Sequence, residues 1–271
     1  MDFSQFADYH LHTPLCRHAN GEPIDYAKSA LDTGLSEIGF SDHSPAKEDD
    51  FDDWRMLLSE FPEYLHSVQA AKNGTPEISV KLGLEIDYFE NDHAWIEQLS
   101  SLADFDYLIG SVHYIAPGFA LDHPKWIGSW SGIAEVEEIW TSYWKIYTNC
   151  ARSGLFDLLA HPDLPKKFGH KPAGDLRRFY EPVIEAALET NTAIEINTVG
   201  WRKECAEQYP ERDFLEMMIS AGLPISISSD AHAPEEVGMN FEEAASLASD
   251  IGFTHTVRFE KRARTEMPFS I

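Results

Sequence analysis

Short apolar runs alternate along the chain with longer segments in which apolar side chains recur every three to four positions. Runs of about four to eight apolar or β-branched residues bounded by turn formers are typical of strands, and the longer periodic segments are typical of amphipathic helices. We expect strands at residues 6–10, 37–40, 79–84, 107–112, 156–160, 193–196, 224–228 and 256–259. Helices are expected at residues 24–31, 92–102, 133–153, 174–190 and 206–221.

Regular alternation of strand and helix predicts a parallel sheet with right-handed crossover connections. Seven or eight such units in 271 residues predict an α/β barrel built as a single domain, residues 1–271. A doubly wound open sheet is the alternative architecture. The barrel is preferred because only closure gathers the C-terminal ends of all strands around one mouth. Residues 46–61 are acidic and aromatic without a clear period, and we expect a loop there that serves as a lid.

Histidines and carboxylates directly follow several of the predicted strands. His10 and His12 are two positions apart, which on an extended strand points both imidazoles to the same face. Asp230 and His232 repeat this spacing after another strand. The complete set of ligand-type residues is His10, His12, His18, His43, Glu85, His113, His161, Asp230 and His232. Imidazole and carboxylate ligands suit zinc, manganese or iron, and nine such residues can hold more than one ion.

These residues also have simpler interpretations. A polar side chain after a strand often caps the next helix, which explains one or two of the set but not five separate strand ends. Cys16 could be a thiolate ligand, although a small buried apolar residue is its more common role. Four aspartates are either partners that orient imidazoles or ordinary caps and turn residues: Asp8, Asp42, Asp87 and Asp163. The remaining histidines are predicted to be non-ligands: His66, His93, His123, His170 and His255.

The charge balance narrows the class of partner. A formal net charge of −25 disfavours nucleic acid and anionic membranes, because phosphate backbones are held mainly by Lys and Arg. We expect a small molecule, which a few gathered cations can still hold. No apolar run of about 18 residues and no basic-apolar leader is found. Three widely spaced cysteines argue against a disulfide framework, so we expect a cytoplasmic protein. Nothing in the pattern indicates an oligomeric state.

The strand-end residues and their neighbours resemble the four-motif signature of the polymerase and histidinol phosphatase (PHP) superfamily. The matching motifs are Asp8-Tyr9-His10-Leu11-His12-Thr13 followed by His18, Asp42-His43, Gly83-Leu84-Glu85, Ser111-Val112-His113, His161-Pro162 and Asp230-Ala231-His232. Residues 13–18 and 195–203, and the chain length, are similar to those of the histidinol-phosphate phosphatase branch. The resemblance runs from residue 6 to about residue 260.

This resemblance implies an α/β fold, a distorted (βα)7 TIM-like barrel with three divalent metal ions (Zn, Fe or Mn) at its C-terminal mouth. An eighth strand at residues 256–259 would exceed the number usual in the family. By position, the first ion would be held by His10, His12, Glu85 and Asp230, the second by His18, His43 and His232, and the third by Glu85, His113 and His161. Glu85 would bridge two ions.

The activity that the resemblance implies is hydrolysis of L-histidinol phosphate to L-histidinol and phosphate, a step of histidine biosynthesis. Divalent ions lower the pKa of water toward about 7, so our hypothesis is that a hydroxide bridging two ions attacks phosphorus directly. Glu85, Asp230 and His232 are the candidate catalytic residues.

Three cations are candidates for contact with the substrate. Arg202 comes first, because it follows the strand at residues 193–196 and a guanidinium matches two phosphate oxygens. Lys203 and Arg17 are further candidates.

Other functions remain open. A PHP-type phosphatase or phosphodiesterase acting on another small phosphoester, such as a nucleoside phosphate, would use the same metals. A non-catalytic metal-binding protein is disfavoured because none of the nine ligand positions is missing. Amidohydrolase chemistry is disfavoured because no strand-end lysine stands where Glu85 does.

Overall fold

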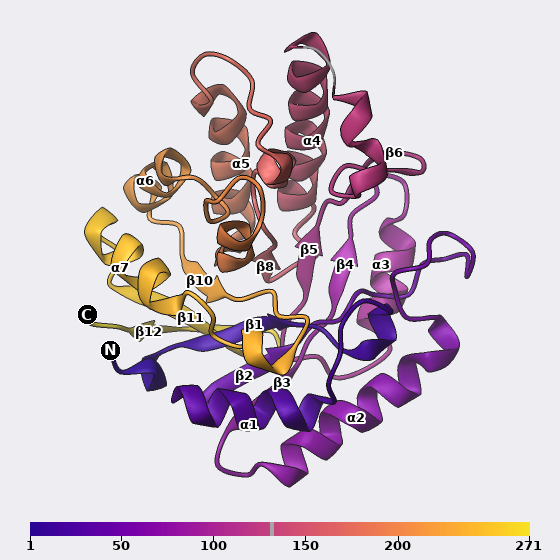
Figure 1. Cartoon of the computed structure of the whole chain (residues 1–271), viewed down its shortest axis with the longest axis vertical. Helices are drawn as coiled ribbons and strands as arrows, with labels where there is room; N and C mark the ends of the chain where they lie inside the picture. Colours follow the sequence, from indigo (N-terminus) through magenta and orange to yellow (C-terminus); the bar gives the residue numbers. More distant parts are fainter. Residues whose placement is uncertain (131–132) are drawn as a thin grey trace.

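The computed structural model describes residues 1–130 and 133–271, and eight of the described strands form two parallel sheets (Figure 1). Their bounds are β1 Ala7–Leu11, β2 Glu37–Phe40, β3 Ser79–Leu82, β4 Glu85–Asp87, β5 Ile109–Ser111, β8 Leu158–Leu159, β9 Ala193–Asn197 and β10 Ile225–Ser228. One sheet has the order β1-β2-β3 and the other β10-β9-β8-β5-β4, and every neighbouring pair runs parallel. The structure is therefore an α/β fold with parallel sheets, as expected.

Helices lie outside these sheets, and chain neighbours pack side by side: α1 with α2, α4 with α5, α5 with α6, and α6 with α7 (Figure 1). Their bounds are α1 Pro23–Thr33, α2 Phe61–Gly74, α3 His93–Ser100, α4 Ile133–Ser153, α5 Arg177–Thr190, α6 Arg212–Ala221 and α7 Phe241–Ile251. Short 3₁₀ turns include η2 Pro14–Cys16, η3 Leu58–Glu60, η4 Pro124–Ser129, η5 Leu164–Phe168, η6 Thr198–Arg202 and η7 Pro234–Glu236. Among the described residues, no helix combines the length and apolarity that crossing a membrane requires.

Local sequence signals explain where several helices begin and end. Pro23 stands in the first turn of α1, where its missing N–H costs no helical hydrogen bond. Gly34 ends this helix with φ of 87°, and Gly222 ends α6 with φ of 78°. Helices commonly end with a residue in this left-handed conformation, and glycine adopts it with less strain than any other residue.

Backbone hydrogen bonds connect the two sheets on both sides. The N–H of His12 donates to the carbonyl of Ala231 at 3.0 Å, joining the end of β1 to the end of β10. The N–H of Ser44 donates to the carbonyl of Glu85 at 2.8 Å, joining the chain after β2 to β4. The first bond lies at the C-terminal ends of β1 and β10, and the second joins the chain just after β2 to the first residue of β4. Together they bring the ligand-type residues of both sheets into one region.

The predicted strand at residues 256–259 does not join the parallel sheets. It belongs to an antiparallel hairpin of β11 His255–Glu260 and β12 Ala263–Pro268. The aromatic ring of Phe259 packs against Tyr9 and Tyr107, with centroids 5.4 and 5.9 Å away. A second hairpin, β6 Tyr114–Ala116 with β7 Phe119–Ala120, follows β5.

The helices differ from the prediction in two ways. α2 and α7 were not expected, although α7 buries Phe241, Ala244 and Ala248 on one side. The periodicity of apolar positions is weak in α2, whereas in α7 it is as strong as in α1 and α4, and this signal was overlooked. α5 and α6 begin at Arg177 and Arg212, later than the predicted starts at residues 174 and 206.

Candidate metal centre

Glu85, the first residue of β4, is surrounded by imidazoles. Its side chain is fully buried, in a position that water cannot stabilise. Its carboxylate oxygens lie near five ring nitrogens: 3.5 Å from Nε2 of His10, 3.9 Å from Nε2 of His12, 2.8 Å from Nδ1 of His43, 3.6 Å from Nε2 of His113 and 3.2 Å from Nε2 of His161. A buried carboxylate shared by so many nitrogens is suited to bridging cations.

Asp230 approaches the same place from the chain after β10. Its Oδ1 lies 3.2 Å from Nε2 of His12 and 3.9 Å from Nε2 of His10. Asp230 adopts φ of 53°, a conformation that costs a non-glycine residue energy and is often found at functional sites. Asn197 donates its amide N–H to Oδ2 of Asp230 at 3.1 Å, which fixes the carboxylate.

A second group is formed by His18, His43 and His232. One ring nitrogen from each lies within 4.8 Å of the others, and Nε2 of His18 is 2.9 Å from Nε2 of His232. The opposite nitrogens of His18 and His232 face the backbone carbonyls of Cys16 and Asp230, at 2.7 and 3.1 Å. The Nδ1 atoms therefore carry the protons, and the Nε2 atoms are free to bind a cation.

Buried carboxylates orient three further imidazoles. Nδ1 of His10 lies 3.1 Å from both carboxylate oxygens of Glu195, and Nδ1 of His12 lies 3.3 Å from Asp42. Nδ1 of His113 lies 2.8 Å from Asp87 in the same way. A carboxylate at one ring nitrogen is the usual outer partner of a metal-bound histidine, because it fixes the tautomer and the ring orientation.

The donor atoms fit divalent ions. Nε2 of His10, Nε2 of His12 and Oε2 of Glu85 are buried and have no hydrogen-bond partner. Buried polar atoms without a partner are costly and need an explanation. Two imidazole nitrogens and a carboxylate oxygen that converge in this way form a ligand set for zinc, iron or manganese.

Burial and neighbouring charges shift the pKa values of the ligand-type residues in different directions. Burial lowers the pKa of His43 and His232 well below the usual imidazole value, and it lowers the pKa of His18 as well. Burial would also lower the pKa of His10, His12 and His113, but nearby carboxylates raise it, to about 9 for His12 and His113. Burial would raise the pKa of Glu85 and Asp230, but nearby imidazoles, including that of His10, hold both well below the usual carboxyl value. A metal that binds His10, His12 or His113 must therefore displace a proton, because metals bind the neutral ring.

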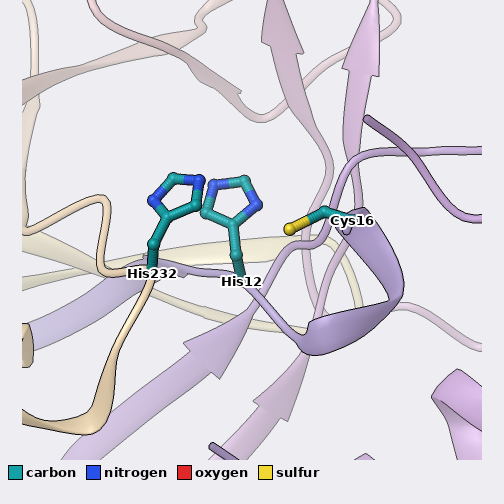
Figure 2. Close-up of side chains that lie close together, drawn as sticks. All are labelled: His12, Cys16 and His232. Atoms are coloured by element: carbon teal, nitrogen blue, oxygen red, sulfur yellow. The ribbon is translucent and has the colours of Figure 1, made fainter. Parts of the chain in front are cut away.

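Cys16 in η2 lies beside His12 and His232 (Figure 2). One ligand atom from each of these side chains lies within 4.8 Å of the others, so the geometry permits a thiolate ligand. Burial, followed by the nearby charge of Asp42, raises the pKa of the Cys16 thiol. Cys16 also fits its other predicted role of a small buried residue.

The ligand-type residues open onto a cavity of about 480 Å³. Its wall includes seven of the nine predicted ligands: His18, His43, Glu85, His113, His161, Asp230 and His232. Among the predicted substrate contacts, only Lys203 lines the cavity. Its ammonium makes no ion pair or hydrogen bond with the described part of the chain.

Arg202 and Arg17 lie differently from what was predicted. The guanidinium of Arg202 donates to the carbonyl of Ser229 at 2.9 Å, and its Nη1 is buried without a partner. Arg17 pairs with Glu60 at the start of α2. Neither side chain is part of the cavity wall, although Nε of Arg202 lies 4.0 Å from Oε1 of the cavity-lining Glu236.

Sequence reasoning missed several residues of the site. Glu195 interrupts an otherwise apolar strand, and a buried acid there was the available signal. Lys167 and Trp54 line the cavity from η5 and from the loop after β2, and no local pattern marks either. His123, predicted to be a non-ligand, also lines the cavity.

Two of the four flanking aspartates do not touch imidazoles. The Asp8 carboxylate accepts the N–H of Ser229 at 2.9 Å, and Asp163 accepts a hydrogen bond from Lys166 at 3.0 Å. They stabilise loops instead.

Comparisons with known proteins identify the class. A model of the PHP domain matches residues 8–199, and the chain belongs to this family. The family predicted from the motifs is thus confirmed.

Within this family the chain is similar to histidinol-phosphatases. It is 39% identical over 261 residues to the probable histidinol-phosphatase of Deinococcus radiodurans, covering 94% of this chain and 96% of the relative. The histidinol-phosphatase of Bacillus subtilis is 26% identical over 263 residues, covering 88% and 97%. The crystal structure of histidinol phosphate phosphatase from Lactococcus lactis with zinc, L-histidinol and phosphate is 20% identical and has a TM-score of 0.75, covering 96% of this chain and 99% of that one.

Proposed function

We propose that the protein hydrolyses L-histidinol phosphate to L-histidinol and phosphate. The observation that supports this proposal most is the convergence of imidazoles and Asp230 on the buried Glu85, at the base of one cavity. The substrate class follows from the 39% identity to a probable histidinol-phosphatase over 94% of the chain. Because the three cysteines are free, we place the activity in the reducing cytoplasm.

The two parallel sheets are proposed to be halves of one distorted seven-stranded barrel. The bonds from His12 to Ala231 and from Ser44 to Glu85 bridge the gaps between the sheets. In this arrangement β3 and β4 are one strand interrupted at Gly83, which lies against the ring of Tyr107. The candidate site then lies at the C-terminal mouth.

Three divalent ions are proposed, as zinc, iron or manganese. The first would be held by His10, His12, Glu85 and Asp230, the second by His18, His43 and His232, and the third by Glu85, His113 and His161. When bound, such ions neutralise phosphoryl charge and lower the pKa of water. Glu85, Asp230 and His232 are the residues of this chain placed closest to the reaction.

Lys203 is proposed to bind the substrate phosphate, because it is a cavity-lining ammonium without a partner in the described chain. Arg202 remains a candidate, since its buried Nη1 has no partner. Arg17 is the weakest of the three candidates, because its guanidinium forms an ion pair with Glu60.

Complementation tests this proposal. The gene should restore growth without histidine to a bacterial strain that requires histidine because it lacks histidinol-phosphatase. The Glu85→Gln variant, produced at the same level, should fail because it removes the bridging carboxylate. Absence of growth with soluble unmodified protein present would contradict the proposed substrate.

A further inference from the structure

Residues 46–60, which connect β2 to α2, form one side of the cavity. Trp54 lines the cavity from this segment. The centroid of its indole lies 4.7 Å from that of the His43 ring and 5.3 Å from that of the His113 ring, with ring planes at 82° and 79°. Trp54 therefore borders directly on two candidate metal ligands.

The segment is anchored beneath Trp54 by a buried guanidinium. Arg55 is only 5% exposed; its Nη2 donates to Asp87 at 2.8 Å and its Nε to Asp52 at 2.8 Å. The hydroxyl of Tyr114 donates to the same Asp52 at 2.8 Å. Because Arg55 satisfies two buried carboxylates, moving it would leave both charges unpaired.

The same two side chains hold the indole in place. The guanidinium carbon of Arg55 lies 4.4 Å from the centre of the Trp54 ring, and the Tyr114 ring lies nearly parallel to it at 9° and 5.9 Å. Asp87, the partner of Arg55, also orients the ring of His113. The position of Trp54 is thus tied to that of a candidate metal ligand.

When the phosphate of a phosphomonoester lies at the ligand cluster, the alcohol part that is bonded to it must lie in the same cavity, close to that cluster. Most of the cavity wall is ionic or imidazole, whereas indole offers polarisable apolar surface that favours flat rings. A protonated imidazole gains further attraction from an indole.

We propose that Trp54 is the specificity-determining residue, selecting phosphomonoesters whose alcohol carries an imidazole or a similar flat ring, and that Arg55 is the positioning residue that fixes it. This inference rests on the proposed function, since L-histidinol phosphate is such an ester. Arg55 acts through Trp54 and does not touch the substrate.

Kinetics of the metal-loaded protein test the inference. Trp54→Leu should lower kcat/KM for L-histidinol phosphate about tenfold through lost ring contact, and change the inhibition constant of inorganic phosphate by less than about twofold. Metal content should not change. Trp54→Phe should recover most of the loss. Leu188→Ala removes an exposed apolar side chain of α5 that is not part of the cavity lining, and it should change neither constant.

Arg55→Lys should also lower kcat/KM for L-histidinol phosphate, as Trp54→Leu does. It should leave the inhibition constant of inorganic phosphate unchanged. Combined with Trp54→Leu, it should cause little further loss, because both act through one contact. Full additivity would assign Arg55 a separate structural role. Unchanged kinetics in Trp54→Leu, or an equal loss of phosphate inhibition, would overturn the inference. An unmodified protein that hydrolyses 4-nitrophenyl phosphate but not L-histidinol phosphate would overturn the proposed function instead.

Discussion

Buried carboxylates set the direction of the imidazoles at the site, and Glu195 is the one that the motifs did not reveal. It contacts His10 and also accepts the N–H of His161 at 2.8 Å. Glu195→Gln should weaken metal binding by about tenfold to a hundredfold, because a neutral amide orients His10 less strongly. Competition with a chelator, followed by metal analysis, measures this.

Glu37→Gln is the matched control. Glu37 is also a buried acid, but it contacts Tyr9 and Lys81 rather than a candidate ligand. Equal losses of metal affinity in the two variants would contradict the role given to Glu195.

Lys203→Met should lower kcat/KM for the phosphoester by about tenfold to a hundredfold, the effect of losing one charge-assisted hydrogen bond. Metal content should stay constant, because the Lys203 ammonium makes no contact with the described ligands. Steady-state kinetics provide the measurement, with Lys72→Met on the exposed side of α2 as control. A loss of metal in Lys203→Met would place it among the structural residues.

Arg202→Ala should raise KM and lower kcat/KM while leaving metal content unchanged. The expected effect is about tenfold, smaller than for a bidentate contact, because the guanidinium already donates to Ser229. Unaltered kinetics would remove Arg202 from the site.

Among the elements, the β11–β12 hairpin supplies a buried aromatic ring to the smaller core cluster. Phe259 is 2% exposed and packs on Tyr9 and Tyr107. Phe259→Ala should lower the free energy of unfolding by about 3–5 kcal/mol through the cavity it leaves. Urea unfolding of the metal-saturated protein measures this, with the exposed Thr265→Ala as control. A change below about 1 kcal/mol would show that the hairpin contributes little to stability.

The elements differ in how well the sequence predicts them. Strands buried on both faces read as largely apolar runs, so residues 37–40 and 193–196, each with a single glutamate, were placed within one residue of β2 and β9. The hairpin was read as a single strand because its turn is Lys261-Arg262, with φ of 50° and 65°. Tight turns with two positive φ values usually contain Asn, Asp or Gly, and none marks this one.

For the whole molecule, the ligand set ties stability to metal binding. Glu85, Asp230, His10, His12, His43, His113 and His161 are buried together, with the more exposed His18 and His232 beside them. Removal of the ions by a chelator should abolish activity and lower Tm by at least about 5–10 °C, the shift expected for one ion, which contributes about 2.7 kcal/mol at a hundredfold excess over its Kd. Calorimetry before and after restoring zinc or manganese measures this. An unchanged Tm after complete removal would contradict a structural contribution of the ions.

The site residues also divide into those that a local sequence signal reveals and those that it does not. All nine predicted ligands lie in one region, because ligand types at strand ends are a local signal that the parallel topology then gathers. Lys167 and Trp54 could not be found, because their place in the cavity depends on how connecting loops pack. The orientation of Arg202 toward Ser229 was equally inaccessible.

Phosphate release by the metal-loaded protein tests the proposed activity most directly. L-histidinol phosphate should be compared with a nucleoside monophosphate and an aryl phosphate under identical conditions. We predict kcat/KM for L-histidinol phosphate at least about a hundredfold above the others, which corresponds to about 2.7 kcal/mol of discrimination. Equal or negligible activity on L-histidinol phosphate would contradict the proposed function and direct the search to other phosphoesters.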